Sequence, residues 1–130
     1  YVDDHAKGID MVQELGKLGE TYNIGGHNER QNIQIIYIIL DTLLEMLPVD
    51  DPRRANVSKD LITYVTDRKG HDRRYAIAPD KIKADIGWEP ETRFEDGIKQ
   101  TIAWFFEHED WMNNVTSGDY QKYYQDMYQK

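Results

Sequence analysis

The chain has 130 residues, a formal net charge of −8, 39% hydrophobic residues and 31% charged residues. This length and balance favour a single globular domain over a disordered chain. The acidic balance argues against general nucleic-acid binding, which needs a broad basic face. There is no signal-peptide pattern at the start, no apolar run near the ~20 residues of a membrane helix, and no Cys for a disulfide or thiolate metal site. We therefore expect a cytoplasmic protein with no membrane and no nucleic-acid partner.

Apolar residues at helical spacing between Ala6 and Leu15 predict a first helix, which Asp3 or Asp4 can cap. Gly8 costs this helix about 1 kcal/mol relative to Ala, which suggests that another backbone packs closely there. Alternating residues then predict a short strand at Glu20–Ile24.

A longer helix is predicted from Ile33 to Leu47, because Pro48 stops it. Apolar side chains cover most of the circumference of its first turns, and such a helix is normally buried on two sides. Two alternatives follow for a domain this small. Either another domain or a second subunit covers the second side, or the helix is the centre of a compact domain. If the second side is uncovered, the apolar helix Ile33–Leu47 can drive self-association.

The β-branched run Leu61–Val65 predicts a second strand, which leads into a loop with four clustered cations, Arg68, Lys69, Arg73 and Arg74. Guanidinium groups match phosphate oxygens two at a time, so this loop suits an anion. The plainer interpretation of such a run is a solvated, charged turn.

Two more helices are predicted, one after Pro79 and one opened by the capping-box pattern Thr92–Glu95. The chain then ends in an aromatic and polar segment, in which Tyr120, Tyr123 and Tyr124 could share a helical face. The predicted fold class is therefore α+β: a helix-rich small domain with a small β-sheet that includes the two strands above.

The sequence carries no recognisable catalytic motif. No nucleophile elbow, P-loop or complete G-x-G-x-x-G pattern occurs. The four His residues have no ligand spacing, so we expect no metal site. No residue is assigned a catalytic or cofactor-binding role, and the charged loop with its aromatic tail favours binding over a self-contained active site.

Four longer motifs follow one another along the chain. In order they are Tyr1-Val2-Asp3-Asp4-His5-Ala6, Gly19-Glu20-Thr21-Tyr22-Asn23-Ile24-Gly25-Gly26, Asp67-Arg68-x-Gly70-His71-Asp72-Arg73-Arg74-Tyr75 and Gly87-Trp88-x-Pro90. With these motifs the whole chain resembles the C-terminal part of the dTDP-glucose 4,6-dehydratases, which are extended short-chain dehydrogenase/reductases. The first two motifs are shared with related nucleotide-sugar enzymes, and Gly-Gly-His-Asn-Glu joined to His-Asp-Arg-Arg-Tyr is the most specific.

The resemblance implies that residues 1–130 form the nucleotide-sugar-binding C-terminal domain of a longer enzyme. Its N-terminal Rossmann domain, which binds NAD and carries the catalytic residues, would lie outside this chain, and an opening at Tyr1 without Met agrees with that expectation. In the implied reaction NAD oxidises C4 of the glucosyl unit, water is lost across C5–C6, and hydride returns to C6. The product is dTDP-4-keto-6-deoxyglucose, and this chain alone is expected to bind no cofactor and to be inactive.

The resemblance also implies substrate contacts by position. Arg68 can pair with the diphosphate, Asn32 can offer its amide, and His71 can donate to a phosphate or ribose oxygen. Lys69 stands where the family usually has Pro, so the loop loses a restraint on φ and gains a charge. For Arg73 and Arg74 we favour structural salt bridges. The implied contacts are Asn32, Asp67, Arg68, Lys69, Gly70, His71 and Tyr128.

Two rival interpretations stay open at this stage. One is the same domain of another nucleotide-sugar enzyme, an epimerase or a decarboxylase. The other is a non-catalytic module that binds a nucleotide sugar or another anion.

Overall fold

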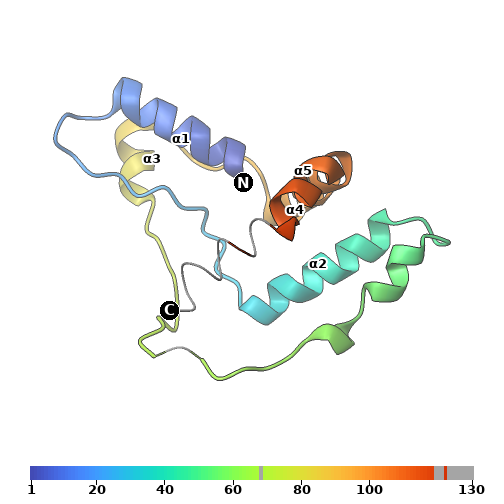
Figure 1. Ribbon diagram of the computed structural model, residues 1–130. Helices are drawn as coiled ribbons and strands as arrows, with labels where there is room; N and C mark the ends of the chain where they lie inside the picture. Colours follow the sequence, from blue (N-terminus) through green and yellow to red (C-terminus); the bar gives the residue numbers. More distant parts are fainter. Residues whose placement is uncertain (68, 119–121, 123–130) are drawn as a thin grey trace. The chain divides into compact units, whose positions relative to one another are not determined.

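The computed structural model describes residues 1–67, 69–118 and 122. These residues form five α-helices and two short 3-10 helices (Figure 1). They belong to two compact units, Tyr1–Ile98 and Lys99–Lys130, which we describe separately. Among the described residues, no helix has both the length and the apolarity needed to cross a bilayer.

The predicted α+β fold class is wrong, because the described part of the chain contains no strand and is all-α. Glu20–Ile24 is irregular, and Leu61–Val65 begins in the 3-10 helix η2 (Lys59–Leu61) and continues as irregular chain. Tyr64 and Val65 are 84% and 83% exposed. A strand needs a partner for its ladder of hydrogen bonds, and β-branched residues do not supply that partner.

In the first unit, α1 (Val2–Leu15) packs against α3 (Asp80–Ile86). Ile82 is completely buried, and Trp88 is only 3% exposed. A Cβ on Gly8 would lie 3.0 Å from Cε2 of Trp88. The close approach predicted at Gly8 is therefore real, but the partner is an indole ring and not another backbone.

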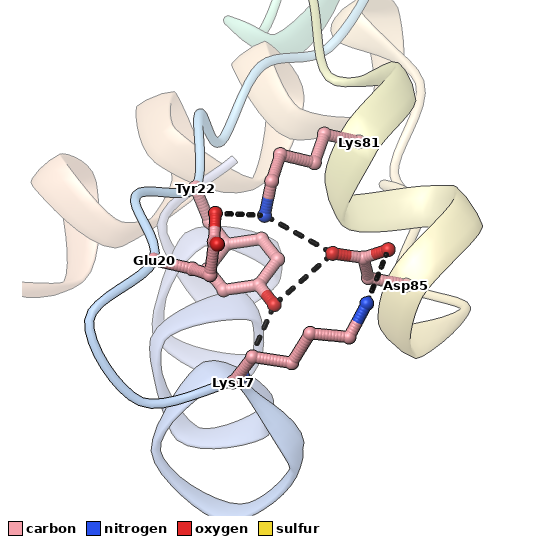
Figure 2. Close-up of polar contacts among 5 residues, drawn as sticks. All are labelled: Lys17, Glu20, Tyr22, Lys81 and Asp85. Atoms are coloured by element: carbon pink, nitrogen blue, oxygen red, sulfur yellow. Dashed lines mark hydrogen bonds and ion pairs between the residues drawn. The ribbon is translucent and has the colours of Figure 1, made fainter.

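A cluster of polar side chains holds the irregular segment after α1 to α3 (Figure 2). The Tyr22 hydroxyl donates to Asp85 at 3.2 Å and accepts the backbone N–H of Lys17 at 3.1 Å. The ammonium group of Lys81 lies 3.0 Å from Asp85, 3.4 Å from Glu20 and 3.6 Å from the centre of the Tyr22 ring. Hydrogen bonds from Lys81 and then Lys17 lower the pKa of the Asp85 carboxyl. Side-chain contacts thus fix this segment in place of the predicted strand pairing.

The long helix α2 runs from Asn32 to Met46, within one residue of its predicted start and end. After it the chain turns through η1 (Pro52–Asn56). Arg54 in η1 donates to the backbone carbonyls of Leu44 and Leu47, at 2.6 and 2.7 Å. This arginine satisfies two of the carbonyl groups that a helix end leaves without partners.

The apolar surface of α2 is poorly covered. Thr42 is the only buried residue of the helix, and its hydroxyl donates to the carbonyl of Ile38 at 2.7 Å. Ile36 and Tyr37 are exposed, and the remaining apolar side chains are half-buried. Within the described residues, the second side of this helix therefore has no full cover.

The second unit begins within α4 (Phe94–Glu107) and includes α5 (Glu109–Thr116). The ring of His108 stacks on Trp104 with 4.3 Å between the ring centroids, and Trp111 meets Trp104 edge-on at 5.2 Å. The predicted tyrosine face at Tyr120, Tyr123 and Tyr124 lies outside the described residues.

Asp4 connects α1 to the chain just before α4, within the first unit. Its carboxylate is 7% exposed and accepts the backbone N–H groups of Glu91, at 3.3 Å, and Thr92, at 3.0 Å. Burial raises the pKa of Asp4, but the hydrogen bonds from Thr92 and Glu91 outweigh it and the net pKa is lowered. The expectation that Asp3 or Asp4 caps α1 is therefore wrong. Helix α1 begins after Tyr1 without a side-chain cap, and Asp4 instead accepts a hydrogen bond from a backbone N–H 87 positions further along the chain.

We predict that Asp4→Asn lowers the free energy of unfolding by about 1–3 kcal/mol, the range for weakening hydrogen bonds to a buried charge. Because the folded-state pKa lies below the unfolded value of about 3.9, this stabilisation is present above that pH. It is lost as the pH falls through the folded-state pKa. Urea unfolding of both chains at several pH values measures the difference, which should vanish in acid.

Asp3→Asn is the matched control, since Asp3 is an exposed carboxylate on the same turn of α1. Equal stabilities for the two variants at pH 7 would contradict the role of Asp4.

Candidate functional site

A groove of about 890 Å³ lies in the first unit, between the chain that leads into α2 and the loop that follows Thr66. One wall is formed by the end of that chain and the first turn of α2, and the other by the charged loop. The lining residues are Asn28, Glu29, Arg30, Gln31, Asn32, Ile33, Gln34, Ile35, Asp67, His71, Asp72, Arg73, Arg74 and Tyr75.

Three of the residues predicted to contact substrate meet at this groove: Asn32, Asp67 and His71. They come together although 35 positions separate the first two. Lys69 and Gly70 form an exposed turn beside the groove and do not line it. The predicted contacts Arg68 and Tyr128 lie outside the described residues.

Asp67 and His71 contact each other across that turn through a hydrogen bond, with 2.7 Å between Oδ1 and Nδ1. Gly70 makes the turn possible with φ +75°, a left-handed conformation that costs other residues free energy. Because Nδ1 of His71 faces the carboxylate, Nε2 is the ring nitrogen left for a ligand. The carboxylate thus sets the orientation of the imidazole, and when the ring is protonated its Nε2–H is the donor that remains for a ligand.

Asn32 is the first residue of α2, where the helix dipole places partial positive charge. A capping box precedes it: Gln31 accepts the N–H of Gln34, and the Gln34 side chain accepts the N–H of Gln31 at 2.9 Å. The box fixes the start of the helix without using the backbone N–H of Asn32.

Arg30 is a groove residue that sequence reasoning missed. Its guanidinium is 2.6 Å from the carboxylate of Glu95, 3.0 Å from the side-chain oxygen of Asn28, and 5.0 Å from the centre of the Phe94 ring. The N–H of Glu95 itself, followed by the charge of Arg30, lowers the pKa of the Glu95 carboxyl. Arg30 stands alone in the sequence, away from the basic loop, so nothing local signalled its role.

The two other arginines of the groove differ from each other. Arg74 lies 3.7 Å from Glu29 on the opposite wall, which agrees with the expected structural pairing. Arg73 is exposed and makes no hydrogen bond or ion pair with any other described residue. The expectation of a salt bridge thus fails for Arg73 within the described part of the chain.

The Gly-Gly-His-Asn-Glu motif forms the turn that begins the first wall. A Cβ on Gly25 would lie 2.9 Å from Cγ2 of Ile77, so only glycine fits there without a shift. His27 adopts φ +46°, which is rare for a residue with a side chain. A smaller cavity of about 160 Å³ lies beside this turn, between Gly25–Glu29 and Tyr75–Ile77. No group of three His, Cys, Asp or Glu in the described chain is placed to hold a metal ion.

We predict that Gly70→Ala lowers the free energy of unfolding by about 1–2 kcal/mol, because the side chain opposes positive φ. No atom lies within 4 Å of the added Cβ, so the cost is purely conformational. Chemical unfolding measures it.

Gly26→Ala is the matched control. Its added Cβ also has open space, and its φ is not positive. This variant should be neutral or up to about 1 kcal/mol more stable. The same destabilisation in both variants would refute the strained-turn explanation.

The chain matches the family model described as GDP-mannose 4,6 dehydratase over residues 1–101. It is 47% identical over 129 residues to a dTDP-glucose 4,6-dehydratase of Salmonella typhimurium, covering 99% of this chain and 34% of the relative. A dTDP-glucose 4,6-dehydratase of Neisseria meningitidis is 45% identical over 121 residues, covering 93% of this chain and 34% of the relative. The chain therefore spans about a third of the length of the curated relatives it matches.

Solved structures of dTDP-glucose 4,6-dehydratases are also similar to this chain. One is a dTDP-glucose 4,6-dehydratase from Bacillus anthracis in complex with NAD, with a TM-score of 0.69 and 41% identity over 85% of this chain and 31% of that chain. Another is a dTDP-glucose 4,6-dehydratase from Streptomyces venezuelae with NAD and TYD bound, with a TM-score of 0.70 and 36% identity over 84% of this chain and 30% of that chain.

Proposed function

Because this chain belongs to the GDP-mannose 4,6 dehydratase family, we propose that it is the nucleotide-sugar-binding part of an NAD-dependent dTDP-glucose 4,6-dehydratase. The reaction of that enzyme turns dTDP-glucose into dTDP-4-keto-6-deoxyglucose. The observation that carries the proposal is the groove, which brings Asn32, Asp67 and His71 to one site beside a helix N-terminus and, in the described part of the chain, three arginines.

In this proposal the residues of the groove bind and orient the substrate. Asp67 holds the His71 ring through Nδ1, so the protonated ring donates Nε2–H to a phosphate or ribose oxygen, and Asn32 offers its side-chain amide. Arg68, Lys69, Gly70 and Tyr128 complete the proposed set of substrate contacts, as carried over from the resemblance.

NAD supplies hydride chemistry in this proposal, and its fit to this chain can be tested against the fold. A dinucleotide binds where a glycine-rich turn joins a strand to a helix. The described residues contain no strand, and the sequence contains no complete G-x-G-x-x-G pattern. The residues present do not fit NAD, so we assign no step of the reaction through it to this chain, which we propose is inactive alone.

We predict that the 130-residue chain binds dTDP and does not turn over dTDP-glucose when NAD is supplied. His71→Ala should weaken dTDP binding about tenfold or more, since a hydrogen bond to a charged group contributes about 1.5–3 kcal/mol. NMR titration measures the binding, and product analysis tests the turnover. Arg53→Ala is the control, because Arg53 is a cation outside the groove that bonds Asp51.

Absence of dTDP binding by the unmodified chain would refute the proposed function. Turnover of dTDP-glucose by this chain would refute its proposed inactivity.

We also propose that the exposed apolar face of α2 lets the chain self-associate, because large uncovered apolar patches favour contact. Sedimentation should show a mass that rises with concentration, and Ile36→Lys on that face should reduce it. Ile9→Lys on α1 is the control, since Ile9 is also exposed but lies on another helix. A monomer at every concentration would count against this proposal. The cytoplasmic location expected from the sequence stays a prediction.

A further inference from the structure

We infer that Arg73 is a further anion-binding residue of the groove, which contacts the diphosphate of the nucleotide sugar directly. This inference rests on the proposed function and adds a residue that the family resemblance did not assign to substrate.

The charges of the groove can be sorted by their partners. Among the described residues, three arginines line it, and two of them are engaged: Arg30 with Glu95 at 2.6 Å, and Arg74 with Glu29 at 3.7 Å. Arg73 is the remaining arginine, and it has no polar partner among the described residues.

The carboxylates of the groove also differ in whether they have a partner. Glu29 faces Arg74, and Asp67 faces His71 at 2.7 Å. Asp72 also lines the groove and forms no ion pair with Arg73, its neighbour in the described chain. The cation of Arg73 is therefore not neutralised by the carboxylates around it in the described part of the chain.

An uncompensated arginine is notable in a chain with a formal net charge of −8, where carboxylates outnumber cations by 24 to 16. Its guanidinium presents a planar fork of N–H donors, which matches two oxygens of one phosphate. It lies on the same groove as Asn32 and His71, which the proposed function assigns to the same ligand. A diphosphate in this groove would supply hydrogen-bond acceptors for the N–H groups of the Arg73 guanidinium.

The role differs from that of the other two arginines. Arg30 is half-buried and binds Asn28 as well as Glu95, so it holds the wall of the groove in place. Arg74 would have to leave Glu29 before it could bind a ligand. Arg73 needs no such exchange, so its contact with a ligand does not carry the cost of breaking an existing ion pair.

The test is titration of the 130-residue chain with dTDP, followed by NMR, which detects weak binding and reports folding in the same spectrum. Arg73→Ala should weaken binding about tenfold or more, the factor expected for a charged hydrogen bond. Arg73→Lys keeps the charge but loses the fork, so its loss should be smaller but measurable. Arg53→Ala is the control, because it removes the same charge at a position outside the groove, where Arg53 bonds Asp51, and should have a much smaller effect.

The possible results separate a failure of the inference about Arg73 from a failure of the proposed function. If the unmodified chain binds dTDP and Arg73→Ala binds equally well, the inference fails and the proposed function stands. If Arg73→Ala and Arg53→Ala lose the same amount of affinity, only general electrostatic attraction is at work and the inference fails again. If the unmodified chain does not bind dTDP, both fail. A selective loss in Arg73→Ala with a folded spectrum supports both.

Discussion

The described structure depends on side chains that hold long irregular stretches of backbone without a strand ladder. Buried backbone N–H and C=O groups need partners, and in a sheet the neighbouring strand supplies them. Here single side chains do this work: Asp4 accepts the N–H groups of Glu91 and Thr92, and Arg54 donates to the carbonyl groups at the end of α2. Such contacts are few and specific, so each one fixes the path of many residues.

The same principle places the groove. Arg30 ties the chain before α2 to Glu95 near the start of α4, and its contact with Asn28 stiffens the wall in front of Asn32. On the other wall, the Asp67–His71 pair closes the turn around Gly70. Both walls are therefore organised before any ligand arrives, which reduces the ordering cost of binding.

Local sequence patterns predicted the helices well, because periodicity and end signals are local. The limits of α2 were found to within one residue, and Gly87 ends α3 with φ +75° as a C-terminal glycine should. The strands failed because alternation specifies an extended backbone and not its partner. The resemblance named Asn32, Asp67 and His71, and the structure places all three at one groove. The resemblance did not distinguish Arg73 from Arg74, because both are cations in one loop. The structure distinguishes them through Glu29, which lies more than forty positions earlier in the chain and pairs with Arg74.

The pairing of charges in the groove also explains how an acidic chain could accommodate the proposed anion site. Compensated pairs such as Arg30 with Glu95 add little net field, but they orient their neighbours and keep carboxylates occupied. In the proposed site, attraction for a diphosphate then depends on donors that have no other partner among the described residues, which include the Asn32 amide and the guanidinium of Arg73. The net charge of the whole chain is a poor guide to such a site, because screening in water limits distant charges to a range of about 10 Å. The positive charge available to the proposed ligand depends on which nearby cations already have a partner.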